Sequence, residues 1–212
     1  MRAEILKKEV SKFTYTESST ATDVARDIKK GARIIGLTRG QFSLVDLIYS
    51  ILTHVTGAAN VVVVTWSAGI KDVRTVEWMR TTSLVKSLTL ITDHSYKTRQ
   101  KKYAIEIEEL FGKENIRTTD IHAKFVLIYN DEWHIAVTTS MNLNANKTCE
   151  HYEIDEGEGI FNFFEKFVIE VCGAMPNGFT ESSVFVNRRL DAIFNNLKDK
   201  HSWIKKSRFK NE

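Results

Sequence analysis

The chain contains 212 residues, of which 42% are hydrophobic and 10% aromatic, with 10 glycines and 1 proline. A chain of this length and composition can bury a sizeable core, which excludes disordered and fibrous proteins. The 30 Lys and Arg against 27 Asp and Glu give a formal net charge of +3, which is too small to indicate a nucleic-acid partner by itself. The distribution of the charge along the chain is therefore more informative than its total.

Features of secreted and membrane proteins are lacking in the sequence. The longest apolar run lies within residues 58–66 and is far shorter than the roughly 20 residues that cross a bilayer. Residues 1–8 carry no apolar signal region. Two cysteines cannot form a disulfide framework or a zinc site by themselves. We therefore expect a cytoplasmic protein without a membrane partner.

The first half of the chain alternates strand and helix patterns. Short β-rich runs without polar alternation predict central parallel strands at residues 34–38, 61–66 and 88–92. Amphipathic patterns predict helices at residues 43–55, 73–84 and 99–111. This order predicts an α/β fold, in which the loops that follow the strands share the edge of the sheet where such folds bind ligands.

Two residues in those loops are candidates for substrate binding. Arg39 precedes the first of the predicted helices, where a cation and backbone N–H groups can receive a phosphate. Trp66 ends the second predicted strand and can stack on a base, although packing in the core or at the rim is at least an equal alternative. Ser43 is expected to cap the helix, with Asp46 completing a capping box.

The second half of the chain has a different pattern. A short polar turn joins residues 124–129 to residues 133–138, which predicts an antiparallel hairpin. A further strand at 151–154 and an apolar helix at 160–171 follow. We expect one domain over residues 1–178 and a helical, basic extension over residues 179–212.

The extension has the most uneven charge. From Arg188 onward it contains eight Lys or Arg and three Asp or Glu. Residues 181–197 also fit an amphipathic helix that packs on the domain with its charges solvated. For Lys205, Lys206 and Arg208 we favour contacts with phosphates.

The chemistry is concentrated around the predicted hairpin. In an extended strand alternate residues share a face, so His122 and Lys124 point the same way. The hairpin brings Ser140 and Asn142 back beside them, and Asn144 in the same loop is a further candidate for substrate binding. Lys124, Asn142 and Ser140 can hold a phosphodiester anion. Neutral His122 can attack its phosphorus if a carboxylate orients the ring.

That carboxylate is expected from Glu150 or Glu153, and the sequence leaves both open. No metal or other cofactor is required, because lysine supplies the cation. A zinc site is disfavoured, since paired His or Cys ligand spacings do not occur.

At these residues the sequence resembles the phospholipase D superfamily, whose half-site is His-x-Lys, then Gly-Ser-x-Asn and a later Glu. His122-Ala123-Lys124 and Ser140-Met141-Asn142 match directly. The resemblance implies a mixed sheet flanked by helices on both faces. Two positions depart from the family pattern: Tyr129 stands where the motif has Asp, and Thr139 replaces the glycine.

Only one half-site occurs in the chain, which by this resemblance implies a homodimer that forms one active site. The resemblance then implies a metal-independent phosphodiesterase, an endonuclease-like enzyme that acts through a phosphohistidine. Nucleic acid, and DNA rather than RNA, is the favoured substrate. The altered motif positions leave a second hypothesis, a weakly active or inactive nucleic-acid-binding or regulatory protein on the same fold. A phosphodiesterase for lipids or small phosphodiesters is the least favoured.

Overall fold

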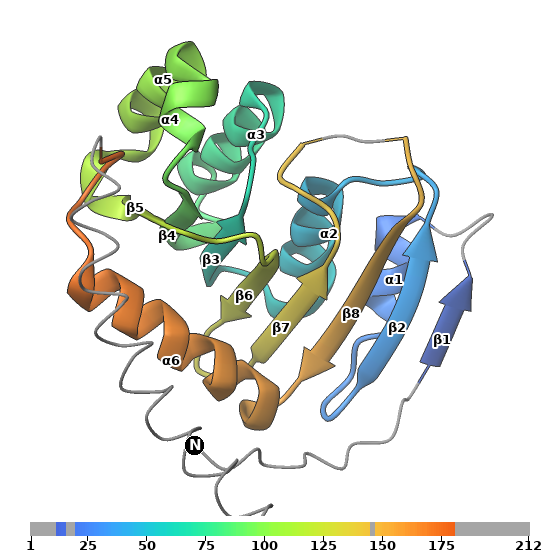
Figure 1. The fold of residues 1–212 in the computed structure, drawn as a ribbon. Helices are drawn as coiled ribbons and strands as arrows, with labels where there is room; N and C mark the ends of the chain where they lie inside the picture. Colours follow the sequence, from blue (N-terminus) through green and yellow to red (C-terminus); the bar gives the residue numbers. More distant parts are fainter. Residues whose placement is uncertain (1–11, 16–19, 145–146, 181–212) are drawn as a thin grey trace, which may run out of the picture.

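The computed structural model describes residues 12–15, 20–144 and 147–180, which form an α/β fold around one mixed sheet (Figure 1). The eight described strands lie in the order β1-β2-β8-β7-β6-β3-β4-β5. The strands are β1 Lys12–Tyr15, β2 Arg33–Thr38, β3 Ala59–Thr65, β4 Val85–Asp93, β5 Ile116–Thr119, β6 Phe125–Tyr129, β7 His134–Thr139 and β8 Glu150–Glu156. The helices are α1 Ala21–Arg26, α2 Leu44–Ile51, which continues as a π-helical segment Leu52–Thr56, α3 Ile70–Thr81, α4 Tyr96–Arg99, α5 Lys101–Phe111, a 3₁₀ turn Lys113–Asn115 and α6 Glu158–Ala174.

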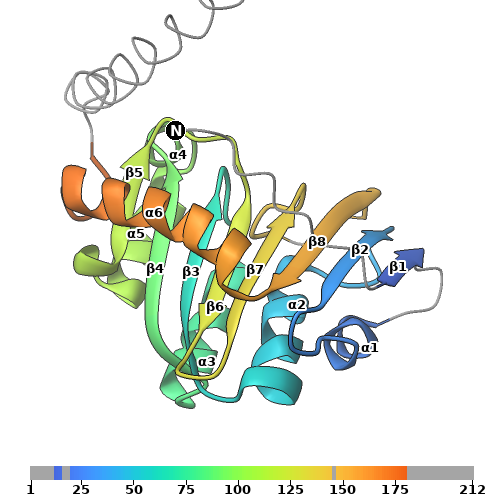
Figure 2. The same ribbon diagram turned by 90° about the horizontal axis from the view of Figure 1, so that it is seen from below.

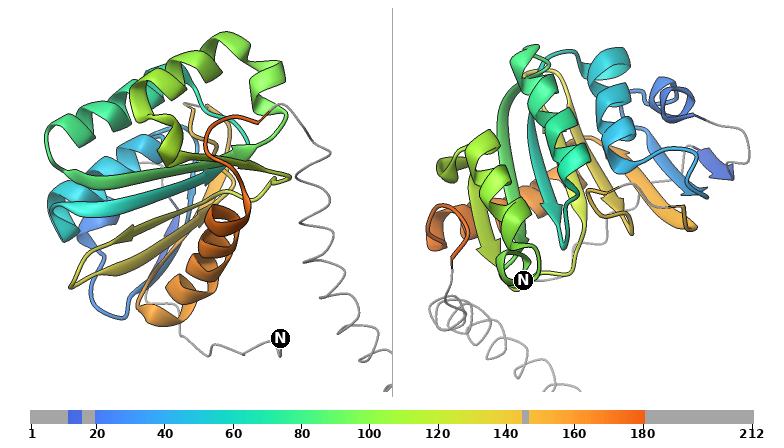
Figure 3. Two further views of the ribbon diagram at one scale, coloured as in Figure 1. Left: turned by 90° about the vertical axis from the view of Figure 1, so that its left-hand side faces the viewer. Right: turned by 90° about the horizontal axis from the view of Figure 1, so that it is seen from above.

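Helices cover both faces of the sheet, as Figure 3 shows. On one face, buried residues of α1, α2, α3 and α5 pack with Val61 and Val63 of β3. On the other face, α6 packs Phe161 and Val168 against a second buried cluster that contains Val62 of β3. The predicted mixed sheet with helices on both faces is thus confirmed.

The prediction for residues 34–38 was wrong in one respect, because β2 is not a neighbour of β3 or β4. It pairs with β1 in parallel and with β8 antiparallel, whereas β3 and β4 are parallel neighbours. Its burial alternates, and Leu37 is 37% exposed. The physical reason is that α6 packs along β6, β7 and β8, and among the described helices none covers the far side of β2 (Figure 2).

The hairpin is confirmed, with Tyr129 of β6 opposite His134 of β7. The sequence pattern did not reveal β1, α1 or β5. Each of these has at most six residues, too few to display a period.

Strand directions bring the polar loops to one edge of the sheet. β2, β3, β4, β5 and β7 end at this edge, and the antiparallel strands β6 and β8 begin there. We call it the site edge; the loop between β7 and β8 rises from it at the top of Figure 1. As expected, residues 38–41, 66–69 and 93–94 all lie at this edge.

The last described residues remain packed on the domain. The Gly178 N–H donates to the Ile116 carbonyl (2.9 Å), and Phe179, 6% exposed, stacks on Tyr96. The expected boundary at residue 178 therefore stays a prediction. The sequence candidates Lys205, Lys206 and Arg208 lie outside the described residues. Among the helices that are described, none has the length and apolar character needed to span a membrane.

Candidate active site

His122 and Lys124 lie in the segment that leads from β5 into β6. Phe125 is buried against α6, so Lys124, one residue before it, points to the opposite face of the sheet. The Lys124 ammonium donates to the His122 carbonyl (2.9 Å) and lies 3.4 Å from His122 Nδ1. The histidine and lysine are thus brought together as the sequence predicted.

Lys124 is partly withdrawn from solvent. Burial lowers the pKa of its ammonium, and the negative charge of Glu150 partly offsets this shift. The carbonyl of Lys124 accepts from the Thr139 N–H (3.1 Å), which fixes the start of β6 against the end of β7. A partly desolvated cation attracts an anion more strongly than one in bulk water.

Ser140 and Glu150 meet where β7 ends and β8 begins. The Ser140 hydroxyl donates to the Glu150 carboxylate and accepts from the His151 N–H (2.9 Å). The second Glu150 oxygen accepts from the Thr148 hydroxyl (3.2 Å). Ser140, Glu150 and Lys124 therefore form one polar cluster at the site edge.

The second candidate acid, Glu153, is not part of this cluster. Its side chain binds Arg33 (3.1 Å) and lies 3.5 Å from His151 Nε2. Tyr152 and Ile154 pack on the α2 side of the sheet, so strand alternation turns Glu153 towards the other side. Glu150 therefore lies in the polar cluster and Glu153 in a separate ion-pair group, and neither contacts His122 among the described residues, so which acid orients His122 stays a prediction.

Asn142 is held at the end of β3. Its carboxamide oxygen lies 3.4 Å from the Thr65 hydroxyl, which donates to the Ser67 carbonyl (2.8 Å) and accepts from the Leu143 N–H (3.2 Å). Continuing the pairing of Val64 with Phe125 places Thr65 opposite Lys124. Asn142 therefore lies beside the lysine, whereas Asn144 is exposed further along the loop.

The altered motif positions have structural roles. The Thr139 hydroxyl donates to the His151 carbonyl (2.6 Å) and accepts from the Met141 N–H (3.0 Å), so it fastens the turn where the family pattern has glycine. Tyr129 packs edge-on against Phe161 of α6 at 5.4 Å between ring centroids, and burial raises the pKa of its hydroxyl. Neither change removes a group of the polar cluster.

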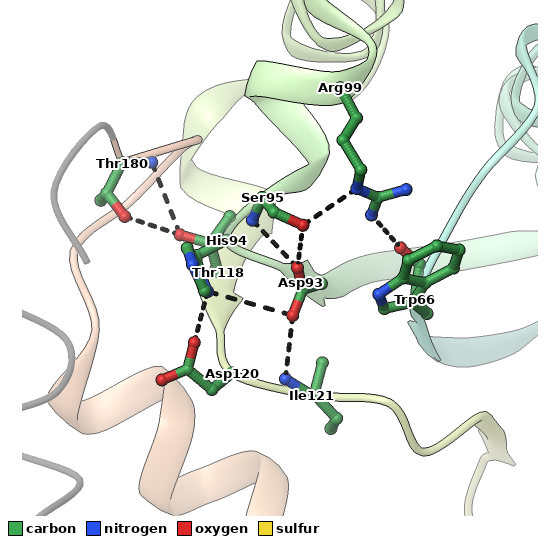
Figure 4. Close-up of polar contacts among 9 residues, drawn as sticks. All are labelled: Trp66, Asp93, His94, Ser95, Arg99, Thr118, Asp120, Ile121 and Thr180. Carbon is green, nitrogen blue, oxygen red and sulfur yellow. Dashed lines mark hydrogen bonds and ion pairs between the residues drawn. The ribbon is translucent and has the colours of Figure 1, made fainter.

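Trp66 neighbours the candidate nucleophile, with 5.6 Å between its ring centroid and that of His122. The Arg99 guanidinium covers Trp66, with its central carbon 3.8 Å from the ring centroid, and donates to the Trp66 carbonyl (3.1 Å), as Figure 4 shows. A base stacking on that face would have to displace Arg99. Sequence reasoning missed Arg99, because it lies 33 residues from Trp66 in the chain.

Arg39 is exposed at the site edge, directly after Thr38, the strand partner of Glu150. Its position is compatible with the substrate contact that the sequence suggested. Ser43 forms the predicted capping box: its hydroxyl accepts from the Asp46 N–H (3.2 Å), and the Asp46 carboxylate accepts from the Ser43 N–H (2.7 Å).

Asp93, His94 and Asp120 form a cluster beside the site, with potential metal-ligand atoms within 4.8 Å of one another. Sequence reasoning did not identify this cluster, because Asp120 belongs to a different strand end. Both Asp93 oxygens already accept hydrogen bonds, from the Ser95 N–H (3.0 Å) and the Ile121 N–H (3.3 Å), which ties β4 to the segment before His122 (Figure 4). These hydrogen bonds explain the position of the Asp93 carboxylate without a bound metal ion.

Comparison with solved structures shows a phospholipase D-like fold. The phospholipase D family member Nuc from Salmonella typhimurium matches 71% of this chain and 100% of its own, with a TM-score of 0.51 at 11% identity. NucT from Helicobacter pylori matches 68% and 99%, with a TM-score of 0.50 at 13% identity. Polyphosphate kinase from Porphyromonas gingivalis matches 90% of this chain but 34% of its own, with a TM-score of 0.52 at 13% identity. No family model and no curated protein matches the sequence.

Proposed function

We propose that the protein is a metal-independent phosphodiesterase that cleaves nucleic acid, with DNA favoured over RNA, at a site shared by two copies of the chain. The observation that carries the proposal is the clustering of His122, Lys124, Ser140 and Glu150 at one sheet edge, with Asn142 beside Lys124. A cation with an amide donor beside it suits a phosphoryl group, and Ser140 fixes Glu150 in the same cluster. The fold shared with the phospholipase D family member Nuc supports the same chemistry.

In the proposed reaction, His122 Nε2 attacks the phosphorus, and the bond from phosphorus to the leaving oxygen breaks. His122 of the partner subunit gives its proton to that oxygen. The partner's His122 then removes a proton from water, whose oxygen attacks the phosphorus and breaks the bond to nitrogen. Lys124 and Asn142 stabilise the charge on the non-bridging oxygens throughout.

Attack through Nε2 requires the ring proton on Nδ1. In the single chain Nδ1 faces the Lys124 ammonium at 3.4 Å, which favours the opposite tautomer because lysine can only donate. Among the described residues, His122 has no carboxylate partner. We infer that a bound phosphate draws the ammonium away from Nδ1 and so permits the reactive tautomer.

The test is incubation of the purified protein with plasmid and single-stranded DNA in EDTA, alongside His122→Ala. We expect cleavage in EDTA that His122→Ala abolishes, and an acid-labile phosphoryl group on the wild-type protein. Cleavage that persists in His122→Ala would contradict the proposal.

The shared site has its own test, in which wild-type protein is mixed and refolded with His122→Ala. If both histidines of a dimer are needed, an equal mixture retains roughly a quarter of the activity that wild-type protein shows at the same total protein concentration. The reason is that subunits pair at random and only wild-type pairs are active. Retention of half the activity, or full activity in a protein that sediments as a monomer, would contradict the shared site.

The 3.4 Å contact of the Lys124 ammonium with Nδ1 in the single chain favours one other candidate, a protein that binds nucleic acid without cleaving it. Equal DNA binding by the wild type and His122→Ala, without cleavage by either, would establish that function instead.

A further inference from the structure

Arg99, the last residue of α4, is fixed at the rim of the candidate site. Its Nε–H donates to the Ser95 hydroxyl (2.9 Å) and its Nη2 to the Trp66 carbonyl (3.1 Å), while the guanidinium carbon lies 3.8 Å from the Trp66 ring centroid. Ser95 is itself held by the Asp93 carboxylate, which accepts from its N–H (3.0 Å). Figure 4 shows this chain of contacts from Asp93 to Trp66. The position of the guanidinium is thus set before any ligand binds.

The charge of Arg99 is not neutralised within the described part of the chain. Its side chain is exposed, and its contacts with described residues are those of Nε and Nη2 with Ser95 and Trp66, neither of which is a carboxylate. Arg74 and Arg80, by comparison, each bind a glutamate. An ordered guanidinium with an unused N–H edge is well suited to bind a phosphate.

Trp66 links Arg99 to His122. The Arg99 guanidinium carbon lies 3.8 Å from the Trp66 ring centroid, and the His122 ring centroid lies 5.6 Å from it. The distance between the guanidinium carbon and the His122 ring centroid therefore cannot exceed the sum of these two lengths. Successive phosphates of one B-DNA strand are separated by at least the axial rise of about 3.4 Å, so this span covers at most about three phosphate steps. A phosphate near the one at His122 can therefore reach Arg99.

We propose that Arg99 forms a second anion subsite, which binds a phosphate neighbouring the one that His122 attacks. This inference rests on the proposed phosphodiesterase function and specifies its substrate as a polynucleotide strand. A lipid or small molecule that carries a single phosphodiester and no other phosphate cannot fill both positions. Trp66 orients Arg99 in this subsite and does not itself stack on a base.

The test compares Arg99→Gln with wild type on two substrates, an oligodeoxynucleotide and bis(p-nitrophenyl) phosphate, which has no second phosphate. We expect kcat/KM for the oligonucleotide to fall about tenfold more than kcat/KM for the small diester, since a hydrogen bond to a charged group is lost only with the former. Equal losses on both substrates would overturn the subsite, because Arg99 would then act on His122 through Trp66.

Equilibrium binding of the oligonucleotide provides a readout that does not depend on turnover. Removing one phosphate contact should make the slope of log K against log salt shallower by about 0.7 for a single strand. Arg99→Lys should retain most of the slope, because it keeps the charge. Arg80→Gln, at the opposite end of α3 from the site edge, is the matched control and should change neither slope nor kcat/KM.

The two proposals fail in different ways. If neither substrate is cleaved but Arg99→Gln weakens oligonucleotide binding and makes the slope of log K against log salt shallower, the proposed phosphodiesterase function is wrong and the anion subsite stands. If cleavage is lost in His122→Ala but Arg99→Gln leaves the slope and the substrate ratio unchanged, the subsite is wrong.

Discussion

The ammonium of Lys124 lies 3.4 Å from Nδ1 of His122 and donates to the carbonyl of the same histidine at 2.9 Å. The lysine therefore bridges the backbone and the ring of the residue that we propose as nucleophile. A phosphate that binds Lys124 must compete with the carbonyl and Nδ1 of His122 for this ammonium. Ligand binding and the tautomer of the histidine ring are therefore coupled.

The pKa of Lys124 predicts an alkaline limit of activity. Burial lowers this pKa, so the ammonium loses its proton at a lower pH than an ordinary lysine, whose pKa is about 10.4. Because the proposed mechanism needs the charged form, kcat/KM should decline as pH rises through the lowered pKa. Lys124→Arg should be less active but lack this decline, since arginine stays charged. A decline at the same pH in Lys124→Arg would show that another group titrates.

Glu150 and Glu153 should differ in their effect on activity. Glu150→Gln removes the negative charge that raises the pKa of Lys124 and weakens the anchor of Ser140. We expect activity to fall about tenfold or more and its alkaline decline to move to lower pH. Glu153→Gln changes a group bound to Arg33 on the other face and should alter activity less than twofold. Melting temperatures of both variants separate this effect from unfolding, and a larger loss in Glu153→Gln would favour that residue.

Tyr96 should contribute to stability through its hydroxyl. The side chain is fully buried, donates to the Ala68 carbonyl at 2.7 Å, and burial raises its pKa to about 12. Tyr96→Phe leaves that carbonyl without its donor, which should cost about 1–3 kcal/mol in the free energy of unfolding in urea. Tyr103→Phe on the exposed side of α5 is the control and should change it by less than about 0.5 kcal/mol. Equal effects would mean that the hydroxyl bond contributes little.

Gly36 is required by close packing against β8. It pairs with Tyr152, and a Cβ at Gly36 would overlap the phenol ring of this fully buried tyrosine. Gly36→Ala should therefore destabilise the fold by about 1–3 kcal/mol in urea unfolding. Gly173 near the end of α6 has open space around its Cβ position, so Gly173→Ala should be neutral or stabilising by up to about 1 kcal/mol. A stable Gly36→Ala would show that the tyrosine can move aside.

Much of the candidate site could be predicted from local pattern. The two apolar runs around a short turn determine the hairpin, and strand alternation places Lys124 away from the buried Phe125. Alternation holds within a strand irrespective of what surrounds it. The capping box of Ser43 and Asp46 is also local, because it needs only the N-cap and N3 residues of one helix.

Contacts between distant segments could not be predicted in this way. The run at 34–38 has the composition of a central strand, but only the tertiary structure places β2 between β1 and β8, where none of the described helices covers one face. Likewise, the register of β8 against β7 and β2 decides that Glu150 joins Lys124 and that Glu153 joins Arg33.

The sequence by itself determined the types of group that the protein presents, a histidine and a lysine on one face of a strand with hydroxyl and amide groups after the next strand. The tertiary structure decided which carboxylate accompanies them and that Arg99 lies on Trp66 beside His122. The physical reason is the range of the interactions. Side-chain alternation is set by neighbouring residues, whereas the meeting of α4 with the end of β3 depends on how parallel strands and their helices pack into one sheet.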